Sequence, residues 1–339
     1  MKLGIVGLAG AGKNTLFEAL TRSEPDAGHR TEDRLAVIRV PDRRVDVLTG
    51  MYKPRKTIYA QIEYCLPSGM KKNERENRWN AVKECDALIQ VVRNFKLPGG
   101  DPPTPYKDLA ALEEEFILAD YLEVEKRLER IDADRKRGKK ADPAETALLE
   151  QARQMLENNQ PLRGNQEISL SPLMRGFTFL SAKPALVLVN NDDDNHDLPP
   201  GDPPAGADIM VVRGRLEHEI SRMPDDEAAE FLKEFNIDQP ATDRAIKRSY
   251  DTLGLISFFT VGEDEVRAWT IKRDTPAVKA AGVIHSDMEK GFIRAEVVAY
   301  DDLISAGSYA EARKKGATRL EGKTYIMADG DIVNFRFNV

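Results

Sequence analysis

Residues 7 to 15, GLAGAGKNT, carry the glycines and the lysine of a phosphate-binding loop. They follow the apolar run LGIV at residues 3 to 6 and lead into KNTLFEALTR, whose apolar residues recur at helical spacing. In a strand, glycine-rich turn and helix, backbone N–H groups converge on phosphate beside the positive end of the helix dipole. A glycine-rich turn that only permits close packing is the alternative. The phosphate contacts predicted by this pattern are Gly10, Ala11, Gly12, Lys13, Asn14 and Thr15.

The loop departs from the pattern G-x-x-x-x-G-K-[ST] at Asn14, where a hydroxyl that binds Mg²⁺ is expected. An asparagine carbonyl can still coordinate a hard cation, so Asn14 weakens a Mg²⁺ site without abolishing it. The second anchor is normally an aspartate in a D-x-x-G turn after the neighbouring strand. The candidate strand here ends IEYCLPSG, with Leu66 at the aspartate position and Gly69 in place. Glu63 lies an odd number of residues upstream, so a regular strand points it to the other face.

A candidate for base recognition follows the apolar run ALVLVN at residues 185 to 190. Purine-binding loops of the N-K-x-D type use an asparagine to brace neighbouring loops and an acid to read the base edge. The segment NNDDDN offers Asn190, Asn191 and Asp193 in this position. The pattern predicts GTP or ATP as the ligand, and a solvated acidic loop is the alternative.

Composition limits the class of protein. The chain has 339 residues, a net charge of −7 and a pI near 5.4, so contact with nucleic acid requires a local basic patch, and we expect no DNA specificity. No apolar run approaches the roughly 18 residues of a spanning helix, and the start of the chain does not resemble a secretory signal. Cys65 and Cys85 are too isolated for a metal site and are interpreted as free thiols. We therefore expect a cytoplasmic protein with no membrane partner.

The apolar runs predict an α/β domain whose sequence is interrupted. Strands are expected at residues 2–7, 35–40, 58–66, 87–95, 185–190 and 207–212. Between residues 108 and 176, two charged amphipathic helices separated by RGKKADP predict an antiparallel hairpin; the first has Leu112, Phe116, Leu118, Leu122, Leu128 and Ile131 as its apolar residues. After residue 256, short strands with brief helices predict a small α+β module. The expected domains are a P-loop nucleotide-binding domain (1–107 and 177–255), a helical insertion (108–176) and a C-terminal module (256–339).

The densest basic cluster, RKRGKK, falls at the turn of this hairpin. One interpretation is a solvated turn between two helices. The functional interpretation is a contact with RNA or the ribosome at the end of a long arm. Its residues are Arg135, Lys136, Arg137, Lys139 and Lys140.

Several stretches resemble the YchF, or Obg-like ATPase, family of Obg-related P-loop GTPases. The likeness begins with GIVGLAGAGKNTLFEALT and continues through VPDRRVDVL and KPALVLVNNDD. It is strongest in VRAWTI, GVIHSDMEKGFIRAEVVAYDDLI and EGKTYIMADGDIVNFRFNV. The resemblance implies a nucleotide-binding domain of Ras-like type, a coiled-coil arm and a C-terminal TGS domain of β-grasp, ubiquitin-like fold. It also implies a translation-associated factor that binds ribosomes and, as in many members, hydrolyses ATP in preference to GTP. Its nucleotide contacts would fall on Gly10 to Thr15 and Asn190 to Asp193.

The sequence departs from the family pattern where hydrolysis takes place. The family has P-N-V-G-K-S-T where this chain has AGAGKNT, and its D-I-A-G-L turn aligns with Leu66 to Gly69. The glycine-rich switch that follows is replaced by MKKNERENR. The first switch is short, and its Mg²⁺-binding threonine aligns near Arg30 or Thr31. Asp193 stands where the family has a glutamate, which leaves the choice between ATP and GTP open.

These departures favour a protein that binds a purine nucleotide and contacts the ribosome or RNA, with slow or absent hydrolysis. We assign no catalytic residue, and Mg²⁺ would be held weakly by Asn14, with Thr31 as a further candidate. One alternative is an active ATPase or GTPase whose partner completes the site. The other is an interaction protein that binds no nucleotide and acts through its TGS module and its arm.

Overall fold

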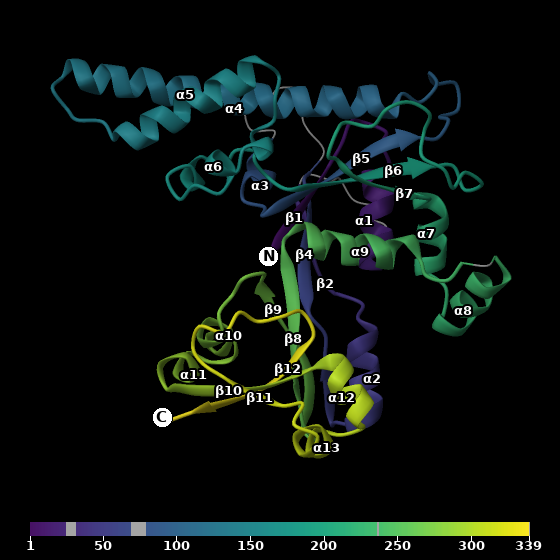
Figure 1. Ribbon diagram of the computed structural model, residues 1–339. Helices are drawn as coiled ribbons and strands as arrows, with labels where there is room; N and C mark the ends of the chain where they lie inside the picture. The colour runs from purple at the N-terminus through teal and green to yellow at the C-terminus, as the bar shows by residue number, and fades with distance from the viewer. Residues whose placement is uncertain (25–31, 69–78, 236, 339) are drawn as a thin grey trace. The chain divides into compact units, whose positions relative to one another are not determined.

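The computed structural model describes residues 1–24, 32–68, 79–235 and 237–338 (Figure 1). The chain forms two compact units: a first unit of Met1–Val37 and Glu63–Ala245, and a second unit of Ile38–Ile62 and Ile246–Val339. The second unit contains the C-terminal segment that the sequence sets apart. It also contains Ile38–Ile62, which the sequence alone assigns to the nucleotide-binding domain.

The first unit is built on a sheet with the strand order β2-β4-β1-β5-β6-β7. Strand β1 pairs in parallel with β4 and β5, and β5, β6 and β7 continue the parallel arrangement. Strands β5 and β6 are buried along almost their whole length, as expected for central strands covered on both faces. The α/β fold expected from the apolar runs is confirmed. Its strands are β1 (Lys2–Val6), β2 (Arg34–Arg39), β4 (Gln61–Leu66), β5 (Ala87–Asn94), β6 (Ala185–Asn191) and β7 (Asp208–Val212).

The prediction of a single strand at residues 58–66 is wrong. The chain forms β3 (Lys56–Ile58) and then β4, and β3 pairs with β9 in the sheet of the second unit. Between them, the carbonyl of Ala60 accepts a hydrogen bond of 2.8 Å from the backbone N–H of Val40. The apolar pattern continues through this break, so it does not reveal that the chain changes from one sheet to the other.

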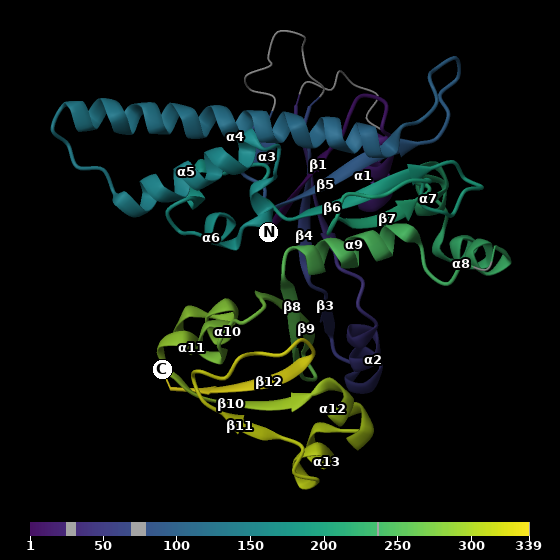
Figure 2. The ribbon, with the colours of Figure 1, turned by 45° about the horizontal axis from the view of Figure 1, so that its top comes forward.

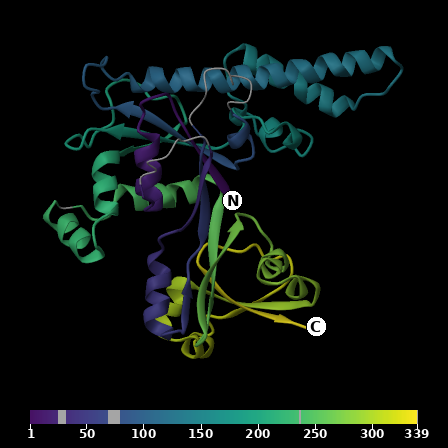
Figure 3. The same cartoon turned by 180° about the vertical axis from the view of Figure 1, so that it is seen from behind.

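Helices surround the first sheet, and α1 lies beside α7 (Figures 1 and 3). Within the described ranges, no helix is both long enough and apolar enough to span a membrane. The helices of the first unit are α1 (Lys13–Thr21), α3 (Asn80–Lys83), α4 (Pro105–Lys136), α5 (Pro143–Glu157), α6 (Gln166–Ser169), α7 (Gly214–Ser221) and α8 (Asp225–Glu234), with 3₁₀ turns at Leu162–Gly164 and Arg175–Phe177. Helix α9 (Ala241–Thr252) begins in the first unit and ends in the second.

The predicted helical hairpin is confirmed as α4 and α5, which Figure 2 shows beside one another. Val124 and Ile131 of α4 pack in one cluster with Leu149 of α5. Leu118 and Leu122, expected on the same apolar face, are instead 59% and 60% exposed. At about 100° per residue they lie roughly opposite Val124, so the heptad-like spacing of leucines overestimates the buried face.

The second unit has a six-stranded sheet in the order β11-β10-β12-β8-β9-β3. Helix α2 joins this unit because the guanidinium of Arg44 donates to both Asp42 and Asp329, each at 2.8 Å, and lies over the ring of Phe259. The remaining elements are α2 (Arg43–Tyr52), β8 (Leu255–Val261), β9 (Glu265–Lys272), α10 (Ala277–Ile284), α11 (Ser286–Lys290), β10 (Phe292–Ala299), α12 (Tyr300–Ala306), α13 (Tyr309–Lys314), β11 (Arg319–Glu321) and β12 (Asp331–Phe337).

Asp120 fixes the long helix α4 to the segment that enters β6. Its buried carboxylate accepts hydrogen bonds from the backbone N–H groups of Leu180 and Ser181, at 2.8 and 2.7 Å, and from the Ser181 hydroxyl at 2.7 Å. Burial raises the pKa of Asp120 to about 6, although these hydrogen bonds oppose the shift. This buried acid is therefore one of the contacts that anchor the hairpin to the rest of the first unit.

We expect Asp120→Asn to lower the free energy of unfolding by about 1–3 kcal/mol. The NH₂ group of asparagine would face N–H and O–H donors from which the carboxylate now accepts hydrogen bonds. The raised pKa means that the folded state binds the proton more tightly than the unfolded state. The stabilising effect of protonated Asp120 is therefore lost as pH rises through about 6, and the cost of the substitution should be larger at pH 5 than at pH 8.

Urea unfolding of both proteins at pH 5 and pH 8 measures this difference. Asp132→Asn, on the same helix at a side chain that is 66% exposed, is the matched control and should change neither value. Equal costs for Asp120→Asn at the two pH values would contradict the assignment.

Candidate functional site

The loop between β1 and α1 is packed so closely that two of its glycines have no room for a side chain. Gly12 precedes α1 with a φ of 89°, and a Cβ there would lie 2.2 Å from the Asn190 amide nitrogen. A Cβ on Gly7 would lie 2.3 Å from the carbonyl oxygen of Val91. The loop therefore rests directly on the ends of β5 and β6, which is the place where parallel α/β sheets bind ligands.

Lys13 extends back over this loop. Its ammonium group donates to the carbonyl oxygens of Gly7 and Leu8, at 2.9 and 2.8 Å. The positive charge therefore lies above the end of β1, on the same side as the loop. It is a suitable place for a cation that contacts phosphate oxygens.

The first turn of α1 is electrostatically suited to an anion. Asn14 and Thr15 are both half-buried in this turn, and the turn contains no acidic residue. The first N–H groups of a helix have no acceptor within the helix, and the dipole makes this end positive. Gly10 is exposed at the outer edge of the loop and Ala11 is buried beneath it.

Asn190 connects the phosphate loop to the turn before α7. Its amide nitrogen donates to the carbonyl of Ala11 at 3.1 Å, and its amide oxygen accepts from the backbone N–H of Gly214 at 2.9 Å. The residue is only 4% exposed, so these bonds are shielded from water. The Asn190 side chain therefore brings loops from three parts of the chain together, which is the bracing contact expected of it.

Asn191 and Asp193, the other two residues of the candidate base loop, differ in burial and in the hydrogen bonds of their polar atoms. The amide oxygen of Asn191 accepts from Asn94 at 2.8 Å, and its nitrogen donates to the carbonyls of Asn195 and Asp197. Asn191 is buried, and its polar atoms stabilise its own loop. The carboxylate of Asp193 is 40% exposed and accepts from the backbone N–H of Leu216 at 3.2 Å.

Three residues near the loop have no motif that reveals them in the sequence. Gly214 approaches Asn190 so closely that a Cβ would lie 2.7 Å from its amide oxygen. Phe95 and Leu97, just after β5, lie within 4 Å of the Cβ positions built on Gly12 and Gly10. They form an apolar edge to the loop, and only the pairing of distant strands brings them there.

The turn after β4 lies where a metal anchor is expected, because β4 is the parallel neighbour of β1. Leu66 at its end is 3% exposed and is a core side chain. The adjacent backbone contacts an acid from elsewhere: the N–H of Ser68 donates to the carboxylate of Asp33 at 2.8 Å. Asp33 precedes β2 and is exposed, and no sequence motif indicated it. Thr31 and Gly69 lie outside the described residues.

The side chains that could bind a metal ion suit a Mg²⁺ ion held mainly by the phosphates of a nucleotide. They suit a Mg²⁺ ion held by the protein alone less well. Across residues 1–24, 32–68, 79–235 and 237–338, no group of three or more histidine, cysteine or acidic side chains could hold a metal ion. Mg²⁺ bound to phosphates needs only one or two protein oxygens, because it retains several waters. Asn14, in the first turn of α1, and Asp33, beside the turn after β4, are two oxygen donors among the described residues that could take this role.

The basic cluster lies where the sequence predicts, at the end of α4 and in the following turn. Arg135 and Lys136 form the last helical turn, and all of the cluster's basic residues are exposed. Lys139 pairs with Asp134 at 3.1 Å, and this ion pair lowers the pKa of Asp134. Basic residues also stabilise the negative end of a helix dipole, so part of the cluster has a structural role.

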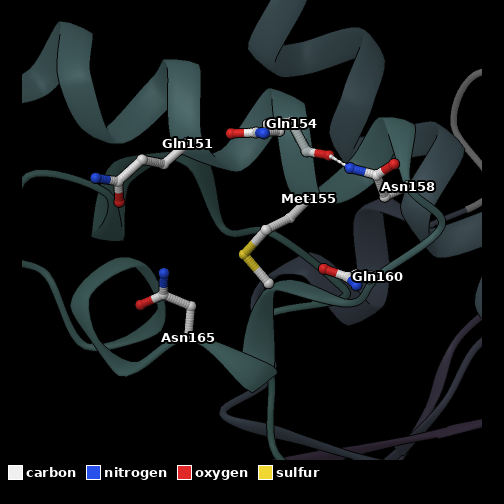
Figure 4. Close-up of a pocket in the computed structure, with 6 residues that line it drawn as sticks. All are labelled: Gln151, Gln154, Met155, Asn158, Gln160 and Asn165. Carbon is white, nitrogen blue, oxygen red and sulfur yellow. Dashed lines mark hydrogen bonds between the residues drawn. The ribbon is translucent and has the colours of Figure 1, made fainter.

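A separate hollow lies on the helical insertion, and none of the residues that line it belongs to the loop at residues 7 to 15 (Figure 4). Its volume is about 290 Å³, and almost every lining side chain carries an uncharged amide. It shares no lining residue with the candidate nucleotide site. The lining residues are Gln151, Gln154, Met155, Asn158, Gln160 and Asn165.

Residues 255–338 match the family model YchF-GTPase_C, which is described as a protein of unknown function (DUF933). The chain is 36% identical to the ribosome-binding ATPase YchF of Bacillus subtilis (strain 168), over 99% of both chains. The chain belongs to the YchF family. It is also 33% identical to Obg-like ATPase 1 of Oryza sativa subsp. japonica, over all of this chain and 92% of that protein.

A solved structure supports this membership. The YchF GTPase of Schizosaccharomyces pombe superposes with a TM-score of 0.83 and 30% sequence identity, over 99% of this chain and 97% of the other. The YchF fold therefore extends over nearly the whole chain, and the resemblance inferred from the sequence is confirmed.

We expect Gly12→Ala to destabilise the protein by about 1–3 kcal/mol, because the new methyl group meets Asn190 and the backbone must keep a left-handed φ. Gly50→Ala is the matched control. Gly50 lies within α2 with no atom within 4 Å of its Cβ position, so alanine there should stabilise by about 0.5–1 kcal/mol. Urea unfolding measures both, and a neutral Gly12→Ala would contradict the packing described.

Proposed function

We propose that this YchF-family chain binds a purine nucleotide at the loop of residues 7 to 15, associates with the ribosome, and hydrolyses the nucleotide slowly or not at all. The observation that carries the nucleotide site is the pair of hydrogen bonds of the Asn190 side chain, which donates to the carbonyl of Ala11 and accepts from the backbone N–H of Gly214. They hold the phosphate loop and the candidate base loop in one fixed arrangement. The relatives are named as ATPases and, in one solved structure, as a GTPase, so GTP and ATP are both candidate ligands.

Each part of the proposed site has one role. The phosphates contact Gly10 to Thr15, with Lys13 supplying the positive charge. Asn190 positions the loops, and Asp193 contacts the base. Asn191 supports the base loop, because its amide is engaged inside the protein.

Slow hydrolysis follows from the metal contacts. Leu66 provides no ligand, and Asn14 provides an amide oxygen in place of a hydroxyl. Bound Mg²⁺ would neutralise charge on the phosphates, and a weakly held ion gives less transition-state stabilisation. The chain's own groups then orient the nucleotide without activating a water molecule.

The ribosome is the proposed partner because relatives are named as ribosome-binding ATPases. The exposed basic cluster at residues 135 to 140 is the proposed RNA contact. Residues 256–339 are proposed to be a TGS domain, and the protein is proposed to act in the cytoplasm.

We expect Lys13→Ala to weaken ATP and GTP binding roughly 10- to 100-fold, because a charge-assisted phosphate contact contributes about 1.5–3 kcal/mol. Isothermal titration calorimetry with each nucleotide, together with phosphate release over several hours, measures this. Lys126→Ala, at an exposed lysine of α4, should bind as the wild type does. If the wild-type protein binds neither nucleotide, the proposal is wrong and the chain is an interaction protein.

One observation favours the alternative of an active ATPase or GTPase. Asp33 contacts the turn after β4, where the missing aspartate would be, and so could replace it as a metal anchor. If it does, Mg²⁺ should strengthen nucleotide binding in the wild type, and Asp33→Asn should remove most of that gain.

Under our leading proposal, Mg²⁺ should change the nucleotide affinity of the wild type by less than about threefold, or about 0.7 kcal/mol. Calorimetry with and without Mg²⁺ on wild type, Asp33→Asn and the neighbouring control Glu32→Gln separates the two. A Mg²⁺-dependent affinity lost only in Asp33→Asn, with phosphate release, would establish the active enzyme.

A further inference from the structure

Residues 95–101, the first part of the loop that joins β5 to α4 (Figure 2), lie against the phosphate loop. We call this segment the strap. A ring carbon of Phe95 is 3.7 Å from the Cβ position built on Gly12, and a methyl carbon of Leu97 is 3.5 Å from the one built on Gly10. Both glycines are proposed phosphate contacts, so the strap supports one side of the loop that would hold the nucleotide.

The middle of the strap is a tight turn that its sequence specifies. The backbone N–H of Gly100 donates to the carbonyl of Leu97 at 3.0 Å, and Pro98 and Gly99 occupy the two central positions. Gly99 has a φ of 68°, which glycine adopts without strain, and the ring of Pro98 restricts its own φ. Proline followed by glycine is a preferred pair for the centre of such a turn. The strap therefore has a defined local shape, and its tertiary contacts decide where that shape is held.

Arg93 connects the two ends of the strap. Its Nη1 donates to the carbonyl of Phe95 at 3.1 Å and to the carbonyl of Asp101 at 3.2 Å. The side chain is half-buried near the end of β5, where Arg93 lies in register with Asn190 of β6. No carboxylate among the described residues forms an ion pair with Arg93, so these two carbonyls are the partners that its guanidinium holds. A planar guanidinium with several N–H donors is suited to fixing two acceptors in one arrangement.

We propose that Arg93 is a positioning residue of the nucleotide site, which holds the strap so that Leu97 stays against Gly10 and the phosphate loop keeps its binding conformation. Without Arg93 the strap would keep its turn but lose the connection between its ends. The phosphate loop would then have to be ordered when the nucleotide binds, and that ordering costs affinity. The inference rests on the proposed nucleotide site and names a residue that prepares it.

Calorimetric titration with GTP, GDP, ATP and ADP tests the role of Arg93. Arg93→Met keeps a long side chain and removes its donors. We expect each nucleotide that the wild type binds to bind roughly three- to tenfold more weakly, with the same factor for a triphosphate and its diphosphate. The factors should agree because the strap acts on the loop and not on one phosphate. Arg175→Met, at an exposed arginine of the helical insertion, makes the same change in charge and should bind as the wild type does.

A double-mutant cycle tests whether Arg93 acts through the strap. Leu97 is 39% exposed, so Leu97→Ala should leave the fold intact and weaken nucleotide binding. In the Leu97→Ala background, Arg93→Met should cost less affinity than it does in the wild type, because the side chain that it positions is gone. Fully additive losses would contradict the assignment. Leu170→Ala, at a leucine of the insertion that is 71% exposed, is the control for Leu97→Ala.

The outcomes distinguish this inference from the proposed nucleotide site. If the wild type binds no nucleotide, the site itself fails and the inference fails with it. If the wild type binds and Arg93→Met, shown to be folded by thermal unfolding, binds equally well, only the inference fails. A loss confined to the triphosphates would identify Arg93 as a direct contact of the terminal phosphate and would also overturn its positioning role. If Arg93→Met does not fold, Leu97→Ala still decides, because unchanged binding would show that the strap does not support the loop.

Discussion

The two hydrogen bonds of the Asn190 side chain are the constraint on which the candidate site depends. They join the phosphate loop after β1 to the turn before α7, from a residue at the end of β6. A buried amide of this kind is costly unless both its donor and its acceptor are paired, and here both are. The contact also explains why Gly12 and Gly214 have no side chain, since a Cβ on either would overlap with Asn190.

The parallel sheet makes this contact possible. Parallel pairing of β1, β5 and β6 brings the ends of these strands to one edge. Loops that leave this edge then meet, although their residues are far apart in the chain. The buried, β-branched character of β5 and β6 keeps the edge rigid, so a hydrogen bond of 3.1 Å between Asn190 and Ala11 can be held without water.

Polar contacts also attach other elements within each of the two units. Asp120 holds α4 against the entry to β6 with three hydrogen bonds, and Glu113 joins Gln90 of β5 to Arg163 of the insertion. In the second unit, Arg44 fixes α2 by pairing with Asp42 and Asp329. In each case one charged group satisfies several partners from distant segments, which specifies the docking geometry more narrowly than apolar packing does.

The sequence by itself determined the strands of the first sheet apart from the start of β4, the helical hairpin, and the glycine-rich turn between β1 and α1. These depend on local patterns: the period of the apolar residues, the glycines at the turn, and Pro143 and Gly138 at helix ends. It also identified the YchF resemblance, because that depends on matching stretches and not on contacts.

The tertiary structure alone decided the break between β3 and β4, the exposure of Leu118 and Leu122, and the use of Asn191 within its own loop. It also decided the approach of Asp33 to Ser68, across 35 residues. The physical reason is that strand pairing and side-chain hydrogen bonds connect residues distant in sequence. A local sequence pattern indicates which helix or strand a segment can form. The pairing of distant segments decides which of its side chains remain accessible to a ligand.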